Sequence, residues 1–79
     1  MKHKSCVFTD SRNVLGVAAI TELSTGQLNV AVVMSGGLSR MEPGAWTWSE
    51  AMDLATQWAD ELLGRQSVPS RWLEGEVAP

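Results

Sequence analysis

Apolar residues recur with the period of a helix between Thr47 and Gly64. On a wheel of about 100° per residue centred on Ala55, one arc is apolar and the opposite arc is polar, as in an amphipathic helix. The apolar arc holds Trp48, Ala51, Met52, Trp58, Ala59, Leu62 and Leu63. The polar arc holds Glu50, Asp53, Gln57, Asp60 and Glu61. The sequence therefore predicts one helix that buries a single face.

Both ends of this helix carry sequence signals. Thr47 followed by Glu50 predicts a capping box, in which each side chain bonds a backbone N–H of the other residue. Trp46 and Ala51 stand where a hydrophobic staple is expected. Gly64 follows the last apolar pair and predicts a left-handed C-terminal cap.

The first half of the chain has the alternation and the β-branched residues of strands. Residues 1–9, 14–23 and 27–34 predict three strands, and residues 38–42 a short fourth one before Pro43. Turn sequences stand between them, namely Asp10-Ser11-Arg12-Asn13, Ser24-Thr25-Gly26 and Ser35-Gly36-Gly37. Turns this short favour an antiparallel meander, because parallel strands need a long crossover.

The second predicted strand is apolar on both faces, so it is expected to be covered on both, by its own fold or by a partner. Its two sets are Leu15, Val17, Ala19 and Leu23, and Val14, Gly16, Ala18 and Ile20. Gly16 indicates a bulge or a close approach of another backbone. In the third strand the set expected to face the helix is Leu28, Val30, Val32 and Met34.

These elements predict one α+β domain over residues 1–66, in which an antiparallel meander of three or four strands carries the helix on one face. Residues 67–79 are expected to form an extended C-terminal tail that frays at its end. Trp72 in this tail has two open roles, docking onto the sheet or contact with another chain, because tryptophan is enriched in cores and at interface hot spots.

Composition fits a small globular protein. The chain has 79 residues, of which 44% are hydrophobic and 19% charged, unlike a disordered segment. No apolar run reaches the roughly 20 residues that span a bilayer, and the start lacks the apolar stretch of a signal peptide. Cys6 is the only cysteine, which excludes an internal disulfide and suits a reducing cytoplasm. Small size also favours a homodimer.

Catalytic and metal-binding patterns are missing from the sequence. His3 is the only histidine and lies near Cys6, but a nucleophile pair needs a third, orienting group in a rigid pocket. A core thiol is the favoured role for Cys6. Residues 35–37 lack the lysine and the spacing of a phosphate loop. A non-enzymatic protein without metal or cofactor is therefore expected.

The net charge of −3 is concentrated in the predicted helix, which has four carboxylates and no Lys or Arg. Asp60 and Glu61 lie in its last turn, where the helix dipole disfavours carboxylates, and no base stands at i±4 on the helix. Such a stripe is either a solvated face, the commoner case, or a surface for a basic partner. The candidate partner-binding residues are Glu50, Asp53, Gln57, Asp60, Glu61 and Trp72.

The segment Gly26 to Val32, followed by Ser49 to Met52, Ala55 and Trp58, resembles small phage-encoded proteins that inhibit host machinery, anti-CRISPR proteins among them. The resemblance lies in the order of hairpin and Ala/Met/Trp helix. It implies binding to a CRISPR effector complex and blocking of DNA access, with carboxylates where DNA phosphates would lie.

Two functions follow as hypotheses. The first is an inhibitor that occupies a basic, nucleic-acid-binding surface of a larger host complex through the acidic helix face, without binding nucleic acid or membrane itself. The alternative is a structural homodimer without a specific ligand that packs through the outer sheet face. The residues assigned to that face are Ala18, Ile20, Ala31 and Val33.

Overall fold

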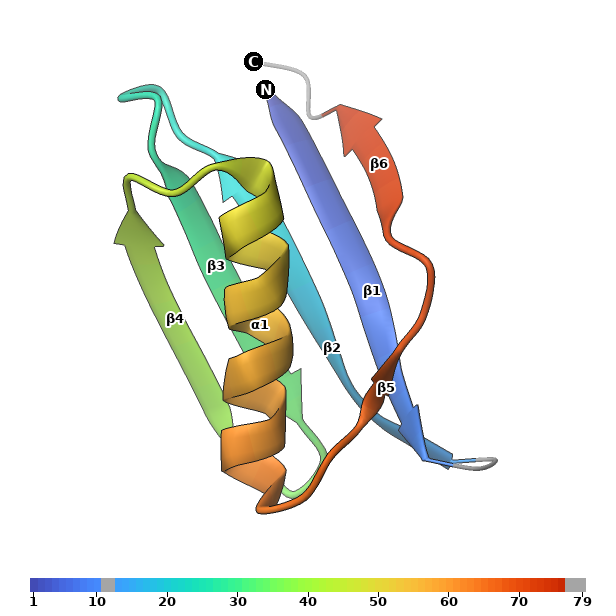
Figure 1. The fold of residues 1–79 in the computed structure, drawn as a ribbon. Helices are drawn as coiled ribbons and strands as arrows, with labels where there is room; N and C mark the ends of the chain where they lie inside the picture. The colour runs from blue at the N-terminus through green and yellow to red at the C-terminus, as the bar shows by residue number, and fades with distance from the viewer. Residues whose placement is uncertain (11–12, 77–79) are drawn as a thin grey trace.

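The chain folds into an antiparallel sheet with a helix lying across one of its faces (Figure 1). This computed structural model describes residues 1–10 and 13–76. Its strands are β1 (Lys2–Asp10), β2 (Asn13–Glu22), β3 (Leu28–Met34), β4 (Ser39–Gly44), β5 (Val68–Pro69) and β6 (Leu73–Glu76), and its helix is α1 (Trp48–Leu63). The sheet order is β4-β3-β2-β1-β5, with β6 also paired to β1. The predicted α+β class is confirmed.

Strands β1 to β4 form the predicted meander, because each pairs antiparallel with the next along the chain. The short fourth strand expected at residues 38–42 is present as β4, although it continues through Pro43 to Gly44. β4 lies at the edge of the sheet, where a proline without an N–H is tolerated. The turn predicted at residues 10–13 includes Ser11 and Arg12, which lie outside the described residues.

Helix α1 has the predicted caps at both ends. The Thr47 N–H donates to the Glu50 carboxylate at 3.0 Å, and the Glu50 N–H donates to the Thr47 hydroxyl at 3.1 Å. Gly64 has a φ of 71° and its N–H donates to the Asp60 carbonyl, so it ends the helix in the left-handed conformation. The positive φ explains why glycine stands at this position.

The core lies between α1 and the sheet face that it covers, called the helix side below. Helix residues Ala51, Ala55 and Ala59 are fully buried, and their small side chains allow the helix to approach the sheet closely. Trp58 is the large buried residue of the helix at 2% exposure. The other members of the predicted apolar arc are only partly buried at the margin of the core: Trp48, Met52, Leu62 and Leu63. Lys4 covers the Trp48 ring, with Nζ 5.4 Å from its centroid.

Strand β2 differs from its predicted faces because it contains a bulge. Phe8 pairs with Gly16 and Thr9 pairs with Val14, so Leu15 is the extra residue and turns toward the helix side. A Cβ on Gly16 would lie 2.5 Å from the Val33 carbonyl oxygen, so the close backbone approach expected at Gly16 is also present.

The faces assigned to β2 beyond the bulge are therefore wrong in part. Ala18 and Ile20 were expected on an outer dimer face, yet they are 1% and 0% exposed in the core. Val17 is 46% exposed on the opposite side. The set predicted for β3 is confirmed, because its four helix-side residues are all buried: Leu28, Val30, Val32 and Met34.

The C-terminal tail predicted after residue 66 pairs with the sheet over parts of residues 68–76, whereas the end that was expected to fray includes residues 77–79, which lie outside the described residues. β5 pairs with Phe8 and Thr9, and β6 pairs with residues 2–5 of β1. Between them the Ser70 N–H donates to the Val7 carbonyl at 2.7 Å, and the Val7 N–H donates to the Ser70 hydroxyl at 2.9 Å. Of the two roles considered for Trp72, the structure shows packing against the core, partly buried.

Candidate functional site

The predicted acidic residues lie on the side of α1 that points away from the sheet. Glu50, Asp53, Gln57 and Glu61 are exposed, and Asp60 is half-buried. The structure divides this stripe into two halves with different surroundings. The C-terminal half is held by other parts of the fold, whereas the N-terminal half borders a hollow.

Asp60 stabilises the path of the chain beyond the helix. Its Oδ1 accepts hydrogen bonds from both the backbone N–H and the hydroxyl of Ser67, each at 2.9 Å. These bonds position the segment that leads into β5. Asp60 therefore has a structural role that the helical pattern alone did not reveal.

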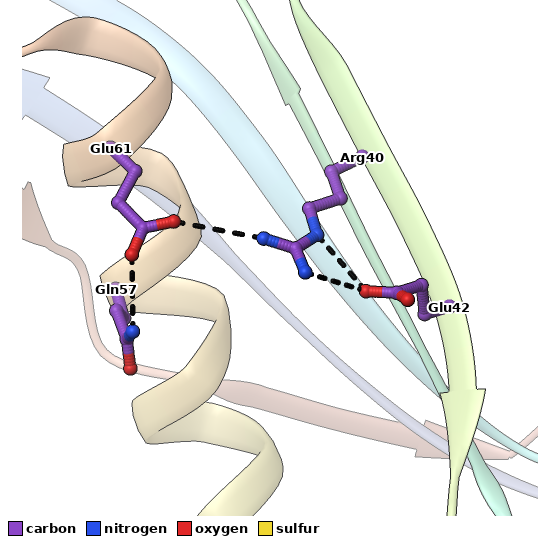
Figure 2. A network of polar contacts seen from close by, with 4 residues as sticks. All are labelled: Arg40, Glu42, Gln57 and Glu61. Carbon is purple, nitrogen blue, oxygen red and sulfur yellow. Dashed lines mark hydrogen bonds and ion pairs between the residues drawn. The ribbon is translucent and has the colours of Figure 1, made fainter.

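Glu61 is part of a polar network between α1 and β4 (Figure 2). It accepts a hydrogen bond from Gln57 at 3.1 Å and lies 3.6 Å from the Arg40 guanidinium. Arg40 also pairs with Glu42 at 2.8 Å and lies over the Trp58 ring, 4.2 Å from its centroid. The charge compensation that the helix sequence lacks in its last turn thus comes from the edge strand.

The hollow beside the N-terminal half of α1 has a volume of about 290 Å³ and is shallow. We call it the acidic hollow, and its lining residues are Trp46, Glu50, Asp53, Leu54 and Gln57. Three of these residues belong to the predicted stripe. The Asp53 side chain makes no hydrogen bond or ion pair with any other described residue, so its carboxylate is available to a ligand.

Glu50 enters the acidic hollow in a fixed position because it belongs to the capping box. The hydrogen bond from the Thr47 backbone N–H, with a further contribution from the Thr47 side chain, lowers the pKa of the Glu50 carboxyl below its ordinary value. Glu50 is therefore ionised at neutral pH. Its negative charge is also favourable in the first turn, near the positive end of the helix dipole.

Trp46 supplies the aromatic wall of the acidic hollow. Its ring lies against Gly44, where an added Cβ would be 2.7 Å from indole atoms, and it contacts Trp58 edge-on with centroids 6.2 Å apart. Glycine at position 44 is therefore required for Trp46 to lie this close to β4. The ring is held from two sides, so the wall is preformed.

Trp46 and Leu54 were not among the predicted site residues. Trp46 was assigned to a staple, and Leu54 lies about 100° from Ala55 on the helical wheel, at the border between the two arcs. The spacing Glu50–Leu54 at i,i+4 places an apolar side chain beside a carboxylate and could have indicated the hollow. The predicted staple placed Trp46 beside the first turn of the helix, but it did not indicate that the ring would line a hollow with these residues.

The arrangement suits recognition of a basic side chain. An indole ring attracts a Lys or Arg cation, carboxylates pair with it, and Leu54 offers apolar contact to its aliphatic stem. The nucleophile pair considered from the sequence is not assembled, because His3 and Cys6 lie on opposite faces of β1. Cys6 is 3% exposed, and burial raises the pKa of its thiol to about 11.

Comparisons of the chain with protein-family models, curated proteins and solved structures give no significant match. Its topology defines an α+β protein in which an antiparallel meander is covered by one helix and completed by two short strands, β5 and β6, that pair with β1. In the part of the chain that the structure describes, no helix has the length and apolar content needed to cross a bilayer. The same residues bring together no group of three or more His, Cys, Asp or Glu able to hold a metal ion.

Proposed function

We propose that this chain is a non-enzymatic binding protein that captures a basic surface of a larger partner through α1. The acidic hollow is the observation that carries this proposal. It combines the ionised Glu50, the unpaired Asp53 and the Trp46 ring within one shallow depression. A protruding Lys or Arg side chain of a partner would find an ion pair and an aromatic contact there.

The surrounding charge supports the same conclusion. Arg40 is the basic residue that pairs with this side of the helix, through Glu61, and it is also paired with Glu42. The outer side of α1 therefore presents a negative surface to a partner. Such a surface speeds encounter with a basic partner and orients it, more than it adds affinity.

The most specific form of the proposal is an inhibitor that occupies the nucleic-acid-binding surface of a host complex such as a CRISPR effector. Such surfaces are rich in Lys and Arg because they neutralise phosphates. The resemblance to small phage-encoded inhibitors supports this form. In a bacterial strain with active CRISPR immunity, expression of the chain should then raise the plating efficiency of a targeted phage.

The binding proposal is tested by capture from bacterial lysate with Asp53→Asn and the matched variant Glu74→Gln. Both remove one negative charge, but Glu74 lies on β6 and does not line the acidic hollow. Asp53→Asn should weaken capture of the main partner by roughly tenfold and reduce its salt dependence. Glu74→Gln should leave capture unchanged. Equal capture by all three proteins would refute the helix face as the binding surface.

A further inference from the structure

The sheet face opposite α1, called the open face below, has no element covering it in the part of the chain that the structure describes (Figure 1). Large apolar side chains are exposed on it: Val17 at 46%, Val33 at 50%, Met41 at 67% and Leu73 at 61%. Strand pairing aligns Val17 with Val33 and Ala31 with Met41, so these side chains are neighbours. The open face therefore has an apolar patch that continues across several strands, beside a row of polar residues in which Thr21 pairs with His3 and Asn29.

Charged residues avoid the open face. Within the described strands, every Lys, Arg, Asp and Glu occupies a register position on the helix side. Examples are Lys4 opposite Ile20, Arg40 opposite Val32 and Glu42 opposite Val30. A sheet face that remains in water normally carries charged residues, so the distribution of charge is inverted here, although polar residues such as Thr21 and Asn29 do lie on the open face. It is the distribution expected of a face that another surface covers.

Two rows of side chains that run across the strands give the open face an uneven surface. Val7, Val17 and Val33 form a ridge across β1, β2 and β3. Beside it runs a row that is low in the middle, because small side chains lie between two large ones. This row consists of Leu73, Ser5, Ala19, Ala31 and Met41.

We infer that the open face is the interface of a homodimer, in which a second copy of this chain packs its own open face against it. A two-fold interface must match itself, and a patch without charges meets its copy without repulsion between like charges. The valine ridge of one copy can enter the low row of the other. Two twisted sheets packed at about −30° would form a sandwich with the helices outside.

The size of the open face agrees with a second copy as occupant. Five strands at about 4.8 Å spacing and about seven residues at 3.4 Å each give a patch of roughly 600 Å². Two copies would then bury roughly 1,200 Å² in total, which is the lower limit for a specific, stable interface. A small domain also gains core volume by such packing.

This inference goes beyond the proposed function, because it requires neither the acidic hollow nor a foreign partner. It retains Ala31 and Val33 from the dimer face expected from the sequence and replaces Ala18 and Ile20 by residues such as Val17 and Met41. In the dimer the two acidic hollows would face outward on opposite sides. One dimer could then contact two basic surfaces.

Sedimentation equilibrium of the full chain over about 1 to 500 μM tests the inference, since an interface of this size is expected to dissociate within that range. The wild type should approach twice the chain mass of 8.6 kDa and go no further. Val33→Lys places a charge in the valine ridge of the patch and should weaken dimerisation at least tenfold. Ser49→Lys adds the same charge on the exposed side of α1 and should dimerise like the wild type.

Circular dichroism at low concentration should show that Val33→Lys is folded, since Val33 is half exposed. Met41→Lys on the edge strand is the second variant if Val33→Lys is unfolded. A wild type that stays monomeric throughout, or a Val33→Lys protein that dimerises normally, would overturn the inference. So would binding of the monomer to neutral phosphatidylcholine vesicles that Val33→Lys abolishes. Sedimentation contains no partner, so its result is independent of the capture assay with Asp53→Asn.

Discussion

The two faces of the sheet have opposite chemistry, and the difference is the reverse of the usual one. On the helix side, Phe8, Ile20 and Val30 are completely buried beneath α1, yet Arg40 and Glu42 share this side at its margin. The open face carries exposed valines, methionine and leucine and no charged strand residue among those described. A solvated face is ordinarily the polar one.

The charged side chains of the strands and their exposed apolar side chains thus lie on different faces of the sheet. Two charged strand residues contact α1 at the margin of its packing: Lys4 lies over the Trp48 ring, and Arg40 lies over Trp58 and pairs with Glu61. The open face offers apolar packing and a few polar side chains without carboxylate or ammonium groups. The two surfaces therefore predict two partners of different chemistry, a basic one for α1 and an apolar one for the open face.

The largest expected effect separates two neighbouring valines on β3. Val32→Ala leaves a cavity under α1 and should lower the free energy of unfolding by about 2–3 kcal/mol. Val33→Ala removes the same atoms from the open face and should cost less than about 1 kcal/mol in the monomer. Urea unfolding at about 1 μM protein, where association contributes little, measures both. Equal losses would contradict the assignment of faces.

The second effect concerns thiol access on the two faces. Burial raises the pKa of Cys6 from 9.0 to about 11, so its labelling at pH 8 should be roughly 100-fold slower than that of an ordinary thiol. A Cys6→Ala, Val33→Cys protein should be labelled rapidly at low concentration, and more slowly when the open face is covered by a second copy. Rapid labelling of Cys6 in the folded wild type would show that this residue is not buried in the core between β1 and α1.

The same pKa shift has a consequence at high pH. The thiol ionises near 9.0 in the unfolded chain but only near 11 in the folded one, so the unfolded state loses its proton first. The contribution of the Cys6 thiol to the free energy of unfolding should therefore be fully present below pH 9.0 and be lost as the pH rises toward 11. Cys6→Ala should remove this part of the pH dependence.

A smaller effect is expected at the start of α1. Thr47→Ala removes the hydroxyl that accepts the Glu50 N–H and should destabilise the protein by about 1 kcal/mol, measured by urea unfolding. Thr47→Ser keeps the hydroxyl and serves as the control. If Thr47→Ala proved as stable as Thr47→Ser, the cap would be energetically unimportant.

The cap also makes an acid-dependent contribution. The pKa of Glu50 is lower in the folded chain than its ordinary value of 4.5, so its stabilising effect is present above that pH and is lost as the pH falls through the folded pKa. Glu50→Gln keeps a side-chain acceptor for the Thr47 N–H but does not titrate. Stability curves from pH 7 to pH 3 should therefore be flatter for Glu50→Gln.

The smallest effect is expected at the margin of the helix side. Arg40→Ala removes two exposed ion pairs and the stacking on Trp58, for a loss of about 0.5–1 kcal/mol. Arg40→Lys should lose less, because it keeps the charge. Thermal unfolding at low and high salt separates the contributions, since stacking is less screened than the ion pairs. A loss that vanishes entirely at high salt would show that stacking on Trp58 contributes nothing.

The sequence predicted the helix with its caps, the meander and the inward set of β3. Its signals for these are local, because periodicity, a capping box and turn residues act over a few positions. The acidic stripe was predicted for the same reason. Three of its residues lie in the acidic hollow, but Asp60 and Glu61 proved to be held by Ser67 and Arg40, which stand on other elements.

The features that the sequence left undetermined depend on how separate elements of the fold meet. A bulge at Leu15 reversed part of the assignment of β2, because one extra residue exchanges the faces of every residue beyond it. The pairing of β6 with β1 and the contact of Trp46 with Trp58 likewise depend on the complete fold. By itself the sequence determined which elements form. Only the tertiary structure decided which side chains face water, because that depends on register and on contacts that no short window contains.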